Sequence, residues 1–224
     1  MDRATIARSE SDFDSSPLSD PTLSDPAHAA LEAWVRRRLG DSGHERRVAN
    51  IARAIFDLTQ DLHDLSRRAR WTLIAAALVH DVGRCADHED HARAGADMIL
   101  ADASLPLSPT ARRWIAYLTL HHRGPVPDVG KDSLLRPGDD APGLLKVLAL
   151  LRAADTLDSR SIEPPRVLLM RRQSHLQISC FLREPSARAE KAFCRPKKFR
   201  LLEQTLDCHV DVEIHLGDAR MLLA

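Results

Sequence analysis

The apolar segment from Trp71 to Val79, which ends in the adjacent pair His80-Asp81, constrains the fold more than any other part of the chain. Its Leu, Ile, Ala and Val residues leave no polar stripe. We therefore expect residues 66–81 to form a helix that is apolar on most faces and hence central. A carboxylate at the end of a buried helix is costly unless a positive group meets it. The segment predicts a central helix whose end faces a cation or another positive partner.

Further helical signals lie on both sides of this segment. Asp25-Pro26 caps a segment that ends near residue 40, and residues 42–62 open with Ser42 and Glu45 in the form of a capping box. The apolar residues of 42–62 recur at spacings of three and four, which indicates one buried face. Later helices are expected at residues 91–102, 108–122 and 144–158, with a Pro/Gly/Asp-rich connection at 124–143.

Pro164-Pro165 marks a change of pattern. After it we expect strands at 166–170, 175–182 and 209–216 and helices at 187–193 and 197–206. Residues 1–25 are rich in Ser, Asp and Pro, which predicts a flexible, disordered tail. The chain is therefore expected to be mainly α, with this tail, a helical domain at 26–162 and a small α+β C-terminal subdomain at 163–224.

Composition excludes several classes of partner. The 32 Lys and Arg residues balance 32 Asp and Glu residues, so no net charge draws the whole chain to nucleic acid or membrane. Aromatic residues make up 4%, too few for a platform that stacks single-stranded bases. We therefore expect no sequence-specific binding of nucleic acid. Apolar stretches are too short for a membrane span, and the N-terminus lacks the apolar core of a signal peptide. We expect a soluble cytoplasmic protein.

Histidine and aspartate residues recur near the ends of the expected helices. His44 lies in a first turn, His80-Asp81 ends the apolar helix, and Asp155 lies in a later, mostly apolar helix. Singly, His44 is more often a surface residue, and Asp155 with Asp158 could simply pair with nearby arginines. Jointly the pattern predicts a metal site, because imidazole and carboxylate suit Mn, Fe, Mg, Co, Ni or Zn.

These residues also carry a resemblance. One His, a His-Asp doublet and a distant Asp resemble the signature of the HD superfamily of metal-dependent phosphohydrolases. More closely, the chain resembles the C-terminal region of the exopolyphosphatase/guanosine pentaphosphate phosphohydrolase (Ppx/GppA) family in segments 42–49, 75–84, 122–123, 150–160, 187–193 and 199–203. The resemblance extends from about residue 30 to residue 216 and implies an HD-domain helical bundle followed by the small α+β subdomain.

The resemblance implies a set of site residues. The ligands of one metal ion would be His44, His80, Asp81 and Asp155. A second ion would be held by His122 and either His91 or His88; the Gly-Ala that follows His91 favours His91, whereas His88 has the spacing seen in some exopolyphosphatases. Asp81, or a second carboxylate, would orient the attacking water, and His121 and Asp158 are less certain members. Candidates to neutralise the substrate phosphates are Arg84, Arg123, Arg152 and Arg160.

The implied function is metal-dependent hydrolysis of a phosphoester or phosphoanhydride in a nucleotide, an alarmone or polyphosphate, with one or two divalent ions. In the Ppx/GppA family this chemistry is carried by N-terminal actin-like lobes, which we do not find in this sequence, so that mechanism is not carried over. The alternative is a non-catalytic polyphosphate- or guanosine-alarmone-binding or regulatory module, supported by the basic run 195–200. An exposed edge of the small sheet could pair two chains into a homodimer.

Overall fold

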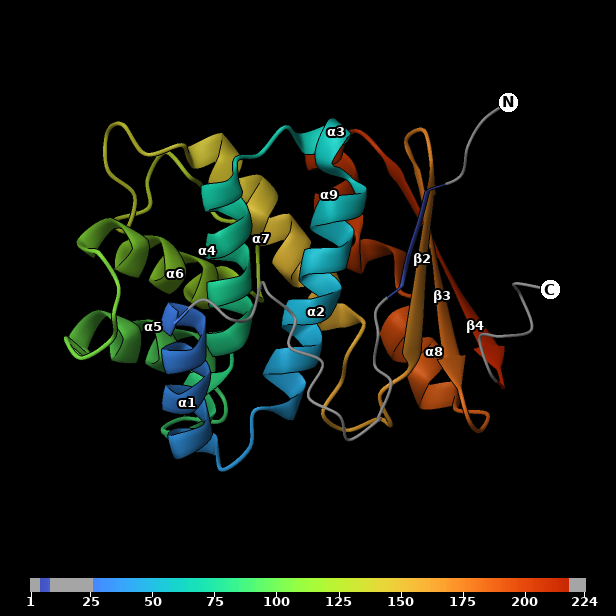
Figure 1. Ribbon diagram of the computed structural model, residues 1–224, viewed down its shortest axis with the longest axis horizontal. Helices are drawn as coiled ribbons and strands as arrows, with labels where there is room; N and C mark the ends of the chain where they lie inside the picture. Colours follow the sequence, from blue (N-terminus) through green and yellow to red (C-terminus); the bar gives the residue numbers. More distant parts are fainter. Residues whose placement is uncertain (1–4, 9–25, 218–224) are drawn as a thin grey trace.

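The structure, a computed structural model, describes residues 5–8 and 26–217. Its first part is helical: α1 (Pro26–Leu39), α2 (Gly43–Leu58), α3 (Gln60–His63), α4 (Arg67–Val79), η1 (Val82–Cys85), α5 (His91–Ala101), α6 (Pro109–His121) and α7 (Ala141–Thr156). Its second part adds β2 (Arg166–Arg172), β3 (His175–Leu182), α8 (Ala187–Phe193), η2 (Pro196–Lys198), α9 (Arg200–Leu206) and β4 (His209–Leu216). Figure 1 shows the sheet along one side of the helices. The predicted fold class, mainly helical with a small C-terminal sheet, is confirmed.

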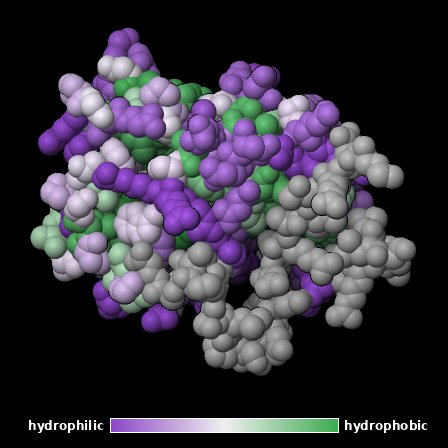
Figure 2. Space-filling view, turned by 45° about the horizontal axis from the view of Figure 1, so that its top comes forward, coloured by the Kyte–Doolittle hydropathy of each residue, from purple (hydrophilic) through white to green (hydrophobic). Residues whose placement is uncertain are grey.

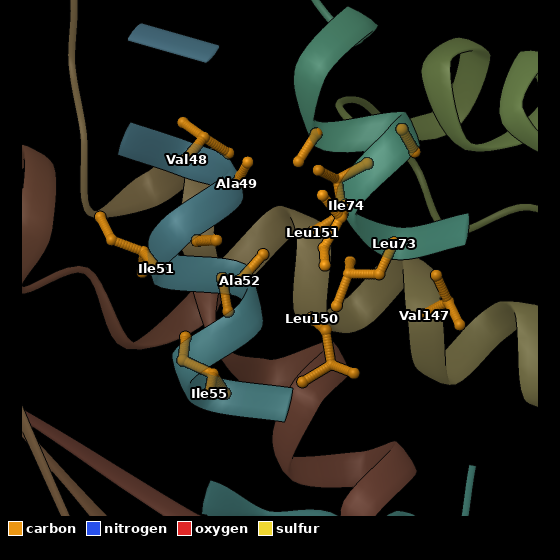
Figure 3. Packing of buried hydrophobic residues seen from close by; sticks show 14 of the residues in the cluster. Val48, Ala49, Ile51, Ala52, Ile55, Leu73, Ile74, Val147, Leu150 and Leu151 are labelled. Carbon is orange, nitrogen blue, oxygen red and sulfur yellow. The ribbon is translucent and has the colours of Figure 1, made fainter. Parts of the chain in front are cut away.

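Helices α2, α4 and α7 form the centre of the molecule. Figure 3 shows Ala52 of α2 facing Leu73 of α4 and Leu150 of α7, and all three side chains are fully buried. Every residue of α4 from Thr72 to Val79 is buried, as the apolar segment predicted. Burying a side chain of the size of leucine contributes about 1.5–3 kcal/mol. These helices therefore form a rigid frame whose ends are held in fixed relative positions.

The sheet has the strand order β1-β2-β3-β4, where β1 is Thr5–Arg8. The β1/β2 and β2/β3 pairs are antiparallel, whereas β3 and β4 are parallel, with His175 opposite His209. A parallel pair needs a crossover connection, and residues 183–208 with α8, η2 and α9 provide it. Because α9 packs against α7 and α2 packs against β2, the sheet shares its hydrophobic core with the helices.

Three local predictions were wrong. Residues 5–8 of the predicted flexible tail pair with β2, because an edge strand gains backbone hydrogen bonds that composition does not reveal; the rest of the tail, 1–4 and 9–25, lies outside the described residues. The helix expected to reach residue 62 ends at Leu58 and is followed by the short α3. The capping box does not form: Ser42 Oγ donates to Glu32, and the carboxylate of Glu45 binds Arg160 instead.

The surface is polar, as expected when most apolar residues lie in the core. The face seen in Figure 2 is mostly hydrophilic, and its hydrophobic residues form small separate patches. Among residues 26–217, no helix combines the length and the apolar character that crossing a membrane requires.

Candidate metal centre

Five helix ends meet at one place on the helical part. His44 lies in the first turn of α2 and His91 begins α5, while His80 and His122 directly follow α4 and α6 and Asp155 lies in the last turn of α7. Asp81 follows His80 and precedes η1. The four histidines and Asp81 are buried, whereas the Asp155 side chain is 31% exposed. Helix packing therefore positions all six side chains.

His44, His80 and Asp81 lie around one point together with Asp155. The Nε2 atoms of His44 and His80 are 3.3 Å apart and lie 3.4 Å and 3.3 Å from Asp155 Oδ1. Asp81 approaches the same atoms, with Oδ2 3.8 Å from His44 Nε2 and Oδ1 3.9 Å from His80 Nε2. The predicted ligands of a first ion thus lie together in space.

A second group shares Asp81 with the first. Asp81 Oδ1 lies 3.1 Å from His91 Nε2 and 3.6 Å from His122 Nε2. The side chain of His88, the alternative to His91, is exposed and its Nε2 lies 2.9 Å from a nitrogen of Arg84. Within the described residues the geometry therefore favours His91 over His88. The two groups, joined through one carboxylate, have the arrangement that a pair of ions would need.

The other ring nitrogen of each histidine has an acceptor. The Nδ1 atoms of His80, His91 and His122 lie 2.8, 3.1 and 2.7 Å from the carbonyl oxygens of Ala77, His88 and Thr119, and His44 Nδ1 lies 2.8 Å from Asp158 Oδ2. Carbonyl and carboxylate oxygens only accept hydrogen bonds, so each Nδ1 carries the hydrogen. Each Nε2 is then left to hold a metal ion or an extra proton, which is the arrangement typical of metal-binding histidines.

The shifted pKa values of the residues at the centre also favour a bound cation. Burial lowers the pKa of His80, but the carboxylates of Asp81, Asp155 and Glu45 outweigh burial and raise that pKa to about 9. Burial and the neighbouring His80 lower the pKa of His122 to about 4. Burial opposes ionisation of Asp81, but His80, His91 and Arg160 hold its pKa well below the usual range. A divalent cation would take the place of the proton on His80, so these donors fit a metal.

Asp158 orients His44. Besides accepting from His44 Nδ1, its carboxylate is buried, and its two oxygens share the single N–H of Arg47 Nε, each at 3.1 Å. Asp158 thus contacts the Nδ1 edge of the imidazole ring, whereas Asp155 lies at Nε2. The sequence placed Asp158 among the less certain ligands, and the structure gives it the position of a residue that holds a ligand in place.

Asp158→Ala is therefore expected to weaken metal binding without removing a ligand. Loss of such an outer partner costs roughly 10–100-fold in metal affinity. Asp158→Asn should retain most of the affinity, because its amide oxygen can still accept from His44 Nδ1. The measurement is a competition titration of Mn²⁺ or Zn²⁺ against a chelator dye. Unchanged affinity in the alanine variant would contradict this role.

Gly83 brings the two groups close together. A Cβ atom on Gly83 would lie 2.1 Å from the carbonyl oxygen of His91 and 2.3 Å from the backbone nitrogen of Gly95. Both are backbone atoms of α5, so no side-chain movement could relieve the contact. Only glycine lets η1 approach the start of α5 closely enough for Asp81 and His91 to meet.

The centre opens into a cavity of about 550 Å³. Three of the predicted arginines line it, and each already has a partner: Arg84 lies near Asp81 and His88, Arg123 near the His91 ring, and Arg160 binds Asp81 and Glu45. The wall formed by α8, η2 and the residues between them adds further basic residues, namely Arg188, Lys191, Arg195 and Lys198. The cavity is large enough for a small phosphorylated compound.

Two predicted residues have other partners. Arg152 is not among the described residues that line the cavity; its guanidinium donates to the carbonyl oxygens of His121, Arg123, Gly124 and Pro125. It therefore holds the end of α6, next to His122, in place of contacting a phosphate. The His121 side chain turns to Asp132, with Nε2 2.6 Å from Oδ2, and takes no part in either group.

Together, fold and site define a class: a mainly helical protein with a buried histidine–aspartate centre at convergent helix ends, open to a basic cavity. Residues 36–187 match the family model described as Ppx/GppA phosphatase, domain III. This match covers more than half of the chain, which therefore belongs to the Ppx/GppA phosphatase domain III family. No curated protein matches the chain.

Several residues of the site were not predicted from the sequence. Glu45, which is buried and binds Arg160, was assigned to a helix cap, and its Oε2 has no hydrogen-bond partner among the described residues. Gly83 follows the His80-Asp81 pair, and in the sequence a glycine there indicates no more than a turn. Arg188, Lys191 and Arg195 recur at spacings of three and four, which is a helical face, but nothing in the sequence showed that this face borders the cavity.

Proposed function

We propose that this protein is a metal-dependent phosphohydrolase of the HD superfamily that hydrolyses a phosphoester or phosphoanhydride. One observation carries the proposal: four imidazoles use Nδ1 as a donor to the surrounding chain and turn Nε2 toward Asp81, and two of them, His44 and His80, also face Asp155. A structural cluster of histidines would have no need to leave every Nε2 in this position. The match to domain III of a phosphatase family relates the chain to proteins that act on phosphorylated compounds, but that family's own hydrolysis is carried by other lobes, so the reaction proposed here depends on the centre itself.

In this proposal His44, His80, Asp81 and Asp155 hold one divalent ion, and Asp81, His91 and His122 hold a second. When bound, such ions supply a water of lowered pKa and polarise a phosphoryl oxygen. Their identity is set by supply among Mn, Mg, Fe, Co, Ni and Zn, since imidazole and carboxylate accept all of these.

The chain's own residues supply the rest of the chemistry. The water oxygen attacks phosphorus, its proton goes to a carboxylate, and the bond from phosphorus to the leaving oxygen breaks, after which that oxygen takes a proton from solvent. Although burial opposes it, the neighbouring histidines hold the pKa of both Asp81 and Asp155 well below the usual range, so exposure distinguishes the two. Asp155 would accept the proton, because its side chain is 31% exposed and its contacts to His44 and His80 use Oδ1, whereas both oxygens of Asp81 face partners. Asp81, the catalytic residue expected from the sequence, would then orient the attacking water and would not accept its proton. Arg84, Arg123 and Arg160 would neutralise the phosphate in the cavity.

A second candidate function is binding of a phosphorylated ligand without turnover, as in a regulatory module. The basic wall of the cavity favours it, because such a wall would bind an anion whether or not hydrolysis follows. This candidate and the enzyme differ in whether phosphate is released.

The deciding experiment combines metal analysis with a phosphate-release screen. We expect about two equivalents of transition metal per chain, and release of inorganic phosphate from at least one of tripolyphosphate, nucleoside triphosphates and a guanosine alarmone with Mn²⁺, Mg²⁺, Co²⁺ or Ni²⁺. Metal binding with no release from any of these would favour the binding module. Protein that takes up no metal would reject both the centre and the mechanism.

A further inference from the structure

Helix α2 brings two adjacent residues to the centre, the candidate ligand His44 and then Glu45. Glu45 is 0% exposed, belongs to neither group of candidate ligands and does not line the cavity. Its Oε1 accepts from the guanidinium of Arg160, whereas its Oε2 has no hydrogen-bond partner in residues 5–8 and 26–217. A carboxylate buried in this way is costly unless a positive group compensates it. A role for Glu45 therefore runs through the guanidinium that it contacts.

Arg160 is held between two carboxylates. Its Nε donates to Asp81 Oδ2 at 2.9 Å, and its Nη2 donates to Glu45 Oε1. A guanidinium is planar and its five N–H donors point in fixed directions, so acceptors on two of its nitrogens fix both its position and its plane. Within the described residues no acceptor meets Nη1, and the Arg160 side chain is 31% exposed and lines the cavity. The two carboxylates thus leave Nη1 available to a molecule in the cavity.

The other two arginines near the centre are held less firmly. Arg84 forms one ion pair, at 3.7 Å from Asp81, and its other contact is with an exposed histidine. Arg123 has no carboxylate partner among the residues with described positions, and its Nη1 lies 3.3 Å and 3.4 Å from the two ring nitrogens of His91. In the described part of the chain, Arg160 is therefore the one of these three arginines that a fully buried carboxylate holds.

We propose that Glu45 is a positioning residue, which holds the guanidinium of Arg160 beside Asp81 so that Nη1 can bind the phosphoryl group that is attacked. Glu45 itself touches neither a metal ion nor the substrate. Donors that are oriented before the reaction stabilise a transition state more than donors that must first be ordered, because no reorganisation is needed. The inference rests on the proposed function, since it concerns the same reacting phosphoryl group.

A first measurement, without metal or substrate, tests whether Glu45 orients Arg160. In a ¹H–¹⁵N NMR spectrum of the wild type, the Nε–H of Arg160 should exchange slowly with solvent, because it is hydrogen-bonded within a fixed guanidinium. Arg160→Lys removes this signal and so identifies it. Glu45→Met removes one acceptor at similar side-chain length, and the exchange should become at least about tenfold faster. An unchanged signal in Glu45→Met would reject the positioning role.

A second measurement tests whether this orientation matters at the site. Arg160→Gln and Glu45→Met should each weaken binding of inorganic phosphate to the Mn²⁺-loaded protein at least about tenfold in calorimetry, and should lower kcat/KM for p-nitrophenyl phosphate by a similar factor. The double variant should lie within about threefold of Arg160→Gln, because the two residues act as one unit. Metal content should stay at the wild-type value in all three variants, since their candidate ligands are intact.

Conservative and control variants complete the design. Glu45→Gln keeps an oxygen that can accept from Nη2, so it should restore part of each loss, and it carries the same comparison if Glu45→Met does not fold. Glu32→Met is the matched control, because Glu32 is a carboxylate of α1 that contacts Ser42 and Arg46 outside the centre. It should behave as wild type in both measurements.

The outcomes separate this role from the proposed function. Losses that multiply in the double variant, or metal lost from Glu45→Met and kept by Arg160→Gln, would overturn the role, because Glu45 would then act on the fold or on the ions. Coupled losses of phosphate binding, with no phosphate released from any compound, leave the role in place and reject hydrolysis. Wild-type turnover by Glu45→Met leaves the enzyme in place and rejects the role.

Discussion

Asp81→Asn is expected to reduce both the metal content and the phosphate release of the protein to background. Asp81 is the residue that both groups of candidate ligands share, with oxygens facing His44, His80, His91 and His122. Asparagine has nearly the same size but lacks the negative charge, so the four imidazoles would surround a neutral group. Metal analysis of purified protein and a phosphate-release assay with Mn²⁺ measure the two effects.

Two single-residue variants, at His91 and His88, test the assignment of the ligands further. His91→Ala removes a candidate ligand of the second group alone, so about one equivalent of metal should remain. His88→Ala changes an exposed histidine three positions earlier and should leave metal content unchanged. Circular dichroism establishes that each variant is folded. If Asp81→Asn keeps two ions, or if His88→Ala loses one, the assignment of the ligands is wrong.

Gly83→Ala is expected to destabilise the fold by about 3 kcal/mol, at the upper end of the usual cost of overpacking. The added methyl group would meet two backbone atoms of α5 at 2.1 and 2.3 Å, and neither can move without shifting the helix. For a protein of this size the melting temperature should fall by roughly 6–12 °C. Because α5 begins with His91, metal affinity should fall as well. Thermal unfolding and metal titration measure the two effects.

The matched control for Gly83→Ala lies in the loop between α6 and α7. Gly130 has open surroundings, and the nearest contact of an added Cβ is a side-chain oxygen of Asp128 at 3.4 Å. Gly130→Ala should therefore change the melting temperature by no more than about 2 °C. If Gly83→Ala were as stable as this control, η1 could not be packed against α5 as closely as the structure has it.

The sequence predicts the helices and the candidate ligands because both depend on local patterns. The apolar run before His80 indicates a buried helix wherever it packs, and an adjacent His and Asp at its end are unusual enough to identify a site. The ends of the helices are less predictable. Ser42 and Glu45 have the spacing of a capping box, yet tertiary contacts with Glu32 and Arg160 use their side chains instead.

Contacts between distant segments could not be predicted. Arg152 stands beside the Asp155 motif in the sequence, but its side chain points to the end of α6 and not into the cavity. Lys191 lies in the crossover between β3 and β4, far along the chain from the candidate ligands, and nothing local in the sequence indicates that its helix borders the cavity. The same is true of β1, whose four residues gain order from pairing with a strand much later in the chain.

The convergence of helix ends has a consequence for stability. An ion held between His44 of α2 and Asp155 of α7 would act as a reversible cross-link between two helices that lie far apart in the sequence. Any ligand that binds only the folded chain adds to its stability, by about 2.7 kcal/mol when its concentration is a hundred times its dissociation constant. The proteolytic lifetime of the protein would then rise and fall with the supply of free metal around it, and a chelator would act as a mild denaturant.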